Sequence, residues 1–155
     1  FIDPSSDPLG SGYHANQSKI AVGSGQITGR GYRKGTQSQM AFLPERHTDF
    51  IFAVIAEETG LVGASALLFL YVVLLLVGVD AARNAKDRLG VLMAGGIVAM
   101  ISLYVCINVG MAVGLVPVVG VPLPLVSYGG TSVLATFLAL GLLLNIRTRR
   151  FMLFY

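Results

Sequence analysis

The chain contains the stretch Leu89-Gly-Val-Leu-Met-Ala-Gly-Gly-Ile-Val-Ala-Met-Ile-Ser-Leu-Tyr-Val-Cys-Ile-Asn-Val-Gly-Met-Ala-Val-Gly-Leu-Val116, 28 residues without a charged side chain. A helix rises about 1.5 Å per residue, so roughly 20 apolar residues cross the hydrocarbon core of a bilayer. Two further uncharged runs flank it, Leu61–Val79 with 19 residues and Thr131–Ile146 with 16. These runs predict an all-α integral membrane protein with three transmembrane helices, over residues 61–79, 89–116 and 131–146.

The composition of the whole chain supports a membrane protein. Of its 155 residues, 54% are hydrophobic and 12% are charged, whereas an ordinary soluble domain has about 25% charged residues. An intrinsically disordered chain is excluded, because disorder needs low hydrophobicity and high charge. The net charge of +3 is small and the basic residues are scattered, so we expect no nucleic acid among the partners. The single cysteine, Cys106, cannot form a disulfide within the chain.

Basic residues indicate which way the helices cross the membrane. Residues 80–88, between the first two spans, contain three Lys or Arg, and the tail at 147–155 contains three Arg. Lys and Arg in short loops mark the cytoplasmic side. We therefore expect both segments in the cytoplasm, and residues 1–48 and 117–130 on the extracytoplasmic side.

Residues 1–48 differ from the rest of the chain in composition. They hold seven of the 19 glycines and three of the six prolines and contain no long apolar run, which predicts a loop with short elements only. Between residues 23 and 35, five glycines accompany the basic residues Arg30, Arg33 and Lys34. Backbone N–H groups and cations of this kind can bind a phosphate, but a basic loop that touches lipid head groups explains them equally well.

Asp49 is the most chemically suggestive residue of the chain. It closes a group of four ionisable residues within five positions: Glu45, Arg46, His47 and Asp49. Thr48 or Asp49 can cap a helix that begins near Phe50, so residues 49–79 are expected to form an interfacial helix leading into the first span, with Asp49 above the membrane boundary. As a cap, Asp49 would stabilise the helix by about 1 kcal/mol; as a partly buried carboxylate it would serve as a general base. The residues alone favour the cap.

The segment Pro117-Val-Val-Gly-Val-Pro-Leu-Pro-Leu-Val-Ser-Tyr-Gly-Gly130 is apolar, yet it contains three prolines and three glycines. A continuous helix is impossible through Pro122-Leu-Pro124. Apolar, non-helical backbone at membrane depth is tolerated only where protein buries it or where it lines a cavity. We therefore expect a re-entrant loop that dips into the membrane, with a short hydrophobic surface loop as the alternative.

The second span contains features that need neighbouring helices. Asn108 lies within it, and polar residues inside a membrane usually face other helices. Gly110 and Gly114 form a Gly-x-x-x-Gly pair, which either brings two helices close together or lines a generic packing face. We interpret the chain as the C-terminal part of a larger polytopic protein.

Five strings of the sequence are informative together: Gln17-Ser-Lys-Ile-Ala-Val-Gly-Ser-Gly25, Gly35-Thr-Gln-Ser-Gln39, Phe42-Leu-Pro-Glu-Arg-His-Thr-Asp-Phe-Ile-Phe52, Ala56-Glu-Glu58 and Pro122-Leu-Pro-Leu-Val-Ser-Tyr-Gly-Gly130. In this order and spacing they resemble the SEDS family of shape, elongation, division and sporulation proteins, most closely its RodA-like branch. The resemblance extends over essentially all of the chain. It implies a polytopic protein of about ten transmembrane helices, of which this chain would supply the last three and the large extracytoplasmic loop before them.

The resemblance implies a function as a peptidoglycan glycosyltransferase of the bacterial cytoplasmic (inner) membrane, acting on its extracytoplasmic side during cell elongation. The implied substrate is lipid II, a disaccharide-pentapeptide on undecaprenyl pyrophosphate. The family's essential aspartate lies in a His-Thr-Asp-Phe motif and corresponds to Asp49, which reverses the preference for a helix cap. The implied chemistry is an inverting transfer with Asp49 as general base.

The leaving pyrophosphate needs cationic stabilisation. Arg46 is the preferred residue because it lies three positions from Asp49. The full set of candidate substrate-binding residues is Arg46, Lys19, Arg30, Arg33, Lys34 and Ser127. We expect no metal site made by the chain, since no compact group of carboxylates and histidines occurs, although a divalent cation (Mg²⁺ or Mn²⁺) can be held by the substrate phosphates. The resemblance also implies a class B penicillin-binding protein as partner.

Two other functions are compatible with the sequence. A translocator (flippase) of lipid-linked precursors suits the polytopic form and Asn108. Transporters, however, concentrate ionisable residues near the bilayer midplane, and these three spans contain no charged residue. The other possibility is a membrane scaffold that recruits a transpeptidase.

Overall fold

The computed structural model describes residues 11–31 and 49–149. They form four helices: α1 (Ser11–Ser24), α3 (Ile51–Arg83), α4 (Arg88–Val113) and α5 (Gly130–Arg149). No strand occurs in these two ranges. Helices α3, α4 and α5 are each long and apolar enough to cross a membrane. The predicted all-α class with three candidate spans is confirmed.

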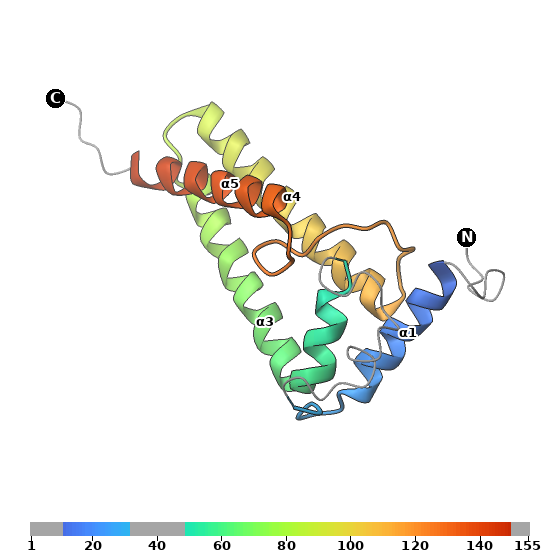
Figure 1. Cartoon of the computed structure of the whole chain (residues 1–155). Coiled ribbons are helices and arrows are strands. Elements are labelled where there is room, and N and C mark those ends of the chain that lie inside the picture. Colours follow the sequence, from blue (N-terminus) through green and yellow to red (C-terminus); the bar gives the residue numbers. More distant parts are fainter. Residues whose placement is uncertain (1–10, 32–48, 150–155) are drawn as a thin grey trace.

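Helices α3 and α4 are joined by the short connection at residues 84–87 and lie close together near it, where α5 crosses them (Figure 1). Toward their other ends α3 and α4 diverge, and α1, the first part of α3 and the segment after α4 occupy that region (Figure 1). One cluster of buried apolar side chains joins these parts; it includes Ala21 of α1, Phe52 of α3, Val105 of α4 and Leu123 of the segment after α4. The region around the candidate site is therefore held by a shared core.

Helix α3 is broken at Gly60. This glycine has φ 69° and ψ −164°, a conformation that residues with a β-carbon rarely adopt. The helical segments on its two sides run at a sharp angle to one another (Figure 1). The break leaves backbone groups of α3 without partners in the helix, and these groups form hydrogen bonds with the segment after α1. Leu61 N donates to Gln26 O at 2.9 Å and Val62 N donates to Ile27 O at 3.2 Å. In the other direction, Arg30 N donates to Glu57 O at 3.1 Å and Gly31 N donates to Glu58 O at 3.0 Å.

The break determines the path of residues 51–59. The sequence predicted that residues 49–79 form an interfacial helix leading into the span, with Asp49 above the membrane boundary. The segment before Gly60 folds back, and the backbone of Asp49 bonds to Asn108 within α4; the level of Asp49 relative to a membrane stays a prediction. Residues 51–59 thus carry Asp49 alongside the second span.

Helix α1 lies within the segment that was expected to contain only loops and short elements. That expectation was wrong for residues 11–24, which form a 14-residue helix. Ser18 and Ala21 are fully buried, and the Ser18 hydroxyl donates a hydrogen bond to Ala112 O at 3.0 Å. Tertiary contacts of this kind stabilise a short helix whose own sequence carries no apolar face.

The Gly110/Gly114 pair ends helix α4. Gly114 adopts φ 75° at the C-cap; Leu115 N donates to Gly110 O at 2.8 Å and Gly114 N to Met111 O at 3.0 Å. These two bonds make a Schellman motif, which glycine at the C-cap permits. Among the described residues, the pair therefore terminates the helix, and its role in packing against neighbouring helices stays a prediction.

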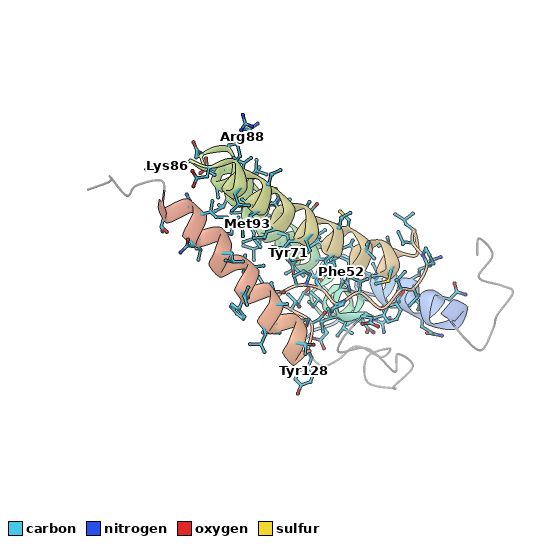
Figure 2. The ribbon with its side chains drawn as sticks, turned by 90° about the horizontal axis from the view of Figure 1, so that it is seen from above. Phe52, Tyr71, Lys86, Arg88, Met93 and Tyr128 are labelled. Atoms are coloured by element: carbon cyan, nitrogen blue, oxygen red, sulfur yellow. The ribbon has the colours of Figure 1, made fainter. Side chains whose placement is uncertain are left out.

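Charged residues gather at the end of the molecule where α3 and α4 connect. Lys86 and Arg88 lie there, at the opposite end from Tyr128 (Figure 2). Arg147 Nη2 of α5 lies 3.9 Å from Asp80 Oδ2 of α3, and both side chains are about half exposed. This arrangement gives the molecule one basic end.

Candidate functional site

Asp49 lies in the turn before α3, with a half-buried side chain. Its carboxylate lies against Gly120: a β-carbon built on that glycine would be 3.1 Å from Asp49 Oδ2. Within residues 11–31 and 49–149, no hydrogen bond or ion pair involves this carboxylate. Phe50 occupies the N-cap position of α3, and no side-chain hydrogen bond caps it. The alternative role of Asp49 as the cap of this helix is therefore wrong.

Asn108 connects Asp49 to the segment after α4. Its Nδ2 donates to Asp49 O at 2.9 Å and to Val121 O at 2.7 Å. The side chain is fully buried. Its Oδ1 has no hydrogen-bond partner in the part of the chain that the structure describes. The polar residue that the sequence marked within the second span thus bonds to two backbone carbonyls, one of them in Asp49.

The segment 117–129 doubles back along both spans. Val119 N donates to Met111 Sδ at 3.1 Å, and the Tyr71 hydroxyl of α3 donates to Pro124 O. Tyr71 and Phe52 both lie among the helices in Figure 2 and are nearly fully buried. The segment thus contacts both α3 and α4, as expected for a re-entrant loop. The depth of this segment in a membrane stays a prediction.

Ser127 closes the turn at the tip of this loop. Its hydroxyl accepts a hydrogen bond from Leu123 N at 2.7 Å, and its own N–H donates to Leu123 O at 2.9 Å. The side chain is only 4% exposed. These contacts give Ser127 a role in shaping the loop, whereas its predicted contact with substrate stays a prediction.

Two of the predicted cationic residues lie in the described ranges. The exposed Lys19 of α1 lies against Gly114, at the C-terminal end of α4. The exposed Arg30 donates from Nε to Ser24 O at 3.3 Å, and its backbone bonds to Glu57 beside the Gly60 break. The other three, Arg33, Lys34 and Arg46, lie outside the described residues.

The structure brings Lys19 and Asp49 to the same short segment of chain. Lys19 contacts Gly114 and Asp49 contacts Gly120, six residues further on. Arg30 is instead bound to the turn at the other end of the 51–59 segment. Of these two predicted cations, only Lys19 contacts the segment that Asp49 also contacts.

A protein-held metal ion does not fit the described residues. In residues 11–31 and 49–149, no three side chains of His, Cys, Asp or Glu lie close enough together to ligate one. A hard divalent cation prefers several oxygen ligands, and Asp49 supplies a single carboxylate. A cation that arrives with the substrate phosphates stays a prediction.

The sequence did not point to Gly120. It lies between Val119 and Val121 in an apolar stretch, where nothing marks it as a neighbour of a carboxylate. Its φ of 75° is the feature that requires glycine. A glycine two residues before Pro122 is a weak signal for such a turn.

The sequence of this chain is similar to that of a known protein family. The sequence profile of the FtsW/RodA/SpoVE family, described as cell cycle proteins, matches residues 1–151. Peptidoglycan glycosyltransferase MrdB of Escherichia coli K12 is 55% identical over 99% of this chain and 41% of its own length. Peptidoglycan glycosyltransferase RodA of Treponema pallidum is 42% identical over 97% of the chain and 35% of its own length.

Solved structures agree. One, titled as the structural coordination of polymerization and crosslinking by a peptidoglycan synthase complex, matches 97% of this chain and 40% of the matched chain with a TM-score of 0.79 at 34% identity. The second is a mutant of the rod shape determining protein RodA of Thermus thermophilus. The match covers 70% of this chain and 36% of the matched chain, with a TM-score of 0.64 at 43% identity. The chain spans about two-fifths of the length of the relatives it matches. The fold, the site and the profile together place this chain in the FtsW/RodA/SpoVE family.

Proposed function

We propose that this chain forms part of a peptidoglycan glycosyltransferase that polymerises lipid II into glycan strands, with Asp49 as its general base. The names of the relatives support the reaction class. The observation that carries the proposal is the Asp49 carboxylate, half-buried against Gly120, with the backbone of Asp49 held by the Asn108 amide. A carboxylate held in place can accept a proton from a substrate hydroxyl.

In the proposed reaction, Asp49 removes the proton from the 4-hydroxyl of the GlcNAc sugar of one lipid II molecule. That oxygen forms a bond to the anomeric carbon of the MurNAc sugar of the other substrate. The bond from that carbon to the pyrophosphate oxygen breaks with inversion, and undecaprenyl pyrophosphate leaves. A well-placed general base contributes about 10²–10⁴-fold to such a rate.

Lys19 is our proposed cation for the leaving pyrophosphate among the described residues, because it reaches the same segment as Asp49. A lysine there also lies near the C-terminal end of α4, where a positive charge is favoured by about 0.3–1 kcal/mol. Developing negative charge on the pyrophosphate would add to that preference. Arg46 stays a candidate from its sequence position alone.

The proposed setting is the cytoplasmic membrane of a bacterium, with Asp49 on the extracytoplasmic side. Support comes from the basic end of the molecule, which carries Lys86, Arg88 and Arg147 and lies away from Phe52, three residues after Asp49 in the chain (Figure 2). Short basic segments stay on the cytoplasmic side. In this orientation the loop at 117–130 faces the leaflet in which the substrate's lipid tail lies after export, and it would wall the lipid site.

A class B penicillin-binding protein is the proposed partner, and the likeness to a peptidoglycan synthase complex supports it. A translocator remains the second candidate from the sequence, but the structure gives it no separate support. Asn108, the polar residue that suited a transporter, has both of its N–H groups bonded to backbone carbonyls. A scaffold would need no carboxylate positioned as Asp49 is.

The test is glycan-strand formation from purified lipid II by the complete protein with its partner. The proposal expects polymer from the wild type and none above background from Asp49→Asn. Equal polymer from both would refute the role of Asp49. Absence of polymer from wild type, together with lipid II transport across liposomes, would instead favour the translocator.

A further inference from the structure

We infer that Asn108 is a positioning residue for Asp49: its amide fixes, at the same time, the residue that carries the base and the loop that lies against it. The inference rests on the proposed function, because it assigns Asn108 a task in that reaction. Asn108 touches no reacting atom in this arrangement. It acts through the backbone of Asp49.

The geometry joins three segments that are far apart in the sequence. The two carbonyls that accept from Asn108 Nδ2 lie 59 residues before it, in Asp49, and 13 residues after it, in Val121. Fixing the carbonyl of Asp49 restrains the backbone next to the Cα atom that carries the carboxylate. Fixing the carbonyl of Val121 restrains the residue directly after Gly120, which the carboxylate contacts. One amide group therefore sets both sides of the contact between base and loop.

The residue type is suited to this task. A planar carboxamide has two N–H groups that point in fixed directions, and here each carbonyl receives one bond. A serine or threonine has a single donor, and an ionised aspartate has none. An apolar residue would leave two carbonyls without their side-chain donor in a buried place, which costs free energy.

Helix α4 offers a matched control one turn further along. The Ser18 hydroxyl donates to Ala112 O at 3.0 Å, which is also a buried side-chain to backbone bond that ties a distant segment to α4. It joins α1 to α4 and involves neither Asp49 nor residues 117–130. Ser18→Ala therefore loses a buried bond to α4 but leaves the Asn108 bonds to Asp49 and Val121 in place.

The experiment uses the complete protein with its partner and compares Asn108→Leu with Ser18→Ala. Steady-state polymerisation of lipid II gives kcat and KM, and thermal unfolding gives stability. Because a shift of the base by about 1 Å can cost about 100-fold, Asn108→Leu is expected to lower kcat at least about tenfold and to leave KM within about twofold. Ser18→Ala, which loses one buried bond rather than two, is expected to lower the unfolding temperature by a smaller amount and to keep kcat within about twofold of wild type.

Two results would overturn the inference. One is a kcat for Asn108→Leu within about twofold of wild type. The other is a loss of kcat in both variants that simply follows their loss of thermal stability, because that pattern indicates a structural role only.

If Asn108→Leu does not fold, Asn108→Gln keeps both N–H groups on a side chain that is one methylene longer. It is expected to unfold near the wild-type temperature with kcat at least about threefold lower; an unchanged kcat overturns the inference. Failure of the proposed function is distinguishable, since it would appear as wild-type polymerisation by Asp49→Asn. Loss of activity in Asp49→Asn with a normal Asn108→Leu refutes only the positioning role.

Discussion

Gly120 lies directly against the carboxylate of Asp49, close enough that a β-carbon on the glycine would come within 3.1 Å of Oδ2. The two residues are 71 positions apart in the chain, and the amide of Asn108 holds the backbone on both sides of their contact. The glycine leaves room for the carboxylate and also adopts φ 75°, which a residue with a β-carbon adopts at a cost.

We predict that Gly120→Ala lowers polymerisation by more than its loss of stability explains. The added methyl group would displace the Asp49 carboxylate, and a small displacement of a base costs about tenfold or more in rate. Thermal unfolding of the same variant measures the loss of stability, which should be about 1 kcal/mol because of the positive φ. An active Gly120→Ala would show that this contact does not position the base.

The break in α3 predicts a large effect at Gly60. A β-carbon there would run into Gly29 N and the backbone of Ile27, and φ is 69°. We expect Gly60→Ala to destabilise the complete protein by about 3 kcal/mol, through strain and loss of the bonds to the segment after α1. Gly23→Ala is the control, because nothing lies within 4 Å of its β-carbon position, and it should be neutral or stabilising by about 0.5 kcal/mol. Equal unfolding temperatures for the two variants would contradict the break.

Membrane orientation is tested by labelling cysteines in intact cells with an impermeant maleimide. In a background that lacks the exposed Cys106, Tyr128→Cys should be labelled from outside, because Tyr128 is 82% exposed at the proposed outer end. Lys86→Cys, at the basic end, should be labelled only after the cells are permeabilised. The opposite pattern would place Asp49 on the cytoplasmic side and rule out polymerisation outside the membrane.

The sequence predicted the helices and the chemistry-bearing residue but not how they meet. The uncharged runs predicted three helices that are long and apolar enough to cross a membrane, because length and hydrophobicity suffice for a helix in lipid. They could not reveal the break at Gly60, since a single glycine is tolerated in many helices. Helix α1 was missed for the opposite reason: its contacts with α3 and α4 stabilise it, and its own sequence has no helical apolar pattern.

For the site, too, the sequence predicted the individual residues but not their contacts. Asp49, Asn108 and the proline loop were each singled out from residue type and position, yet nothing in the sequence joined them. Their association depends on the backbone carbonyls of Asp49 and Val121, and every residue carries such a group. A long-range hydrogen bond to a backbone carbonyl does not require a particular residue type at the accepting position, so the sequence cannot reveal it.

The central claim is that Asp49 is the general base, and replacing its carboxylate by an amide of the same shape tests it most directly. The measurement compares wild type, Asp49→Asn and Asp87→Asn of the complete protein with its partner, by the initial rate of glycan polymerisation from lipid II. Asp87 is exposed at the start of α4 and makes no capping bond, so its amide variant controls for the change in charge. The account predicts wild-type rates for Asp87→Asn and a rate at least about 100-fold lower for Asp49→Asn, with equal unfolding temperatures. A polymerisation rate for Asp49→Asn close to that of wild type would contradict it.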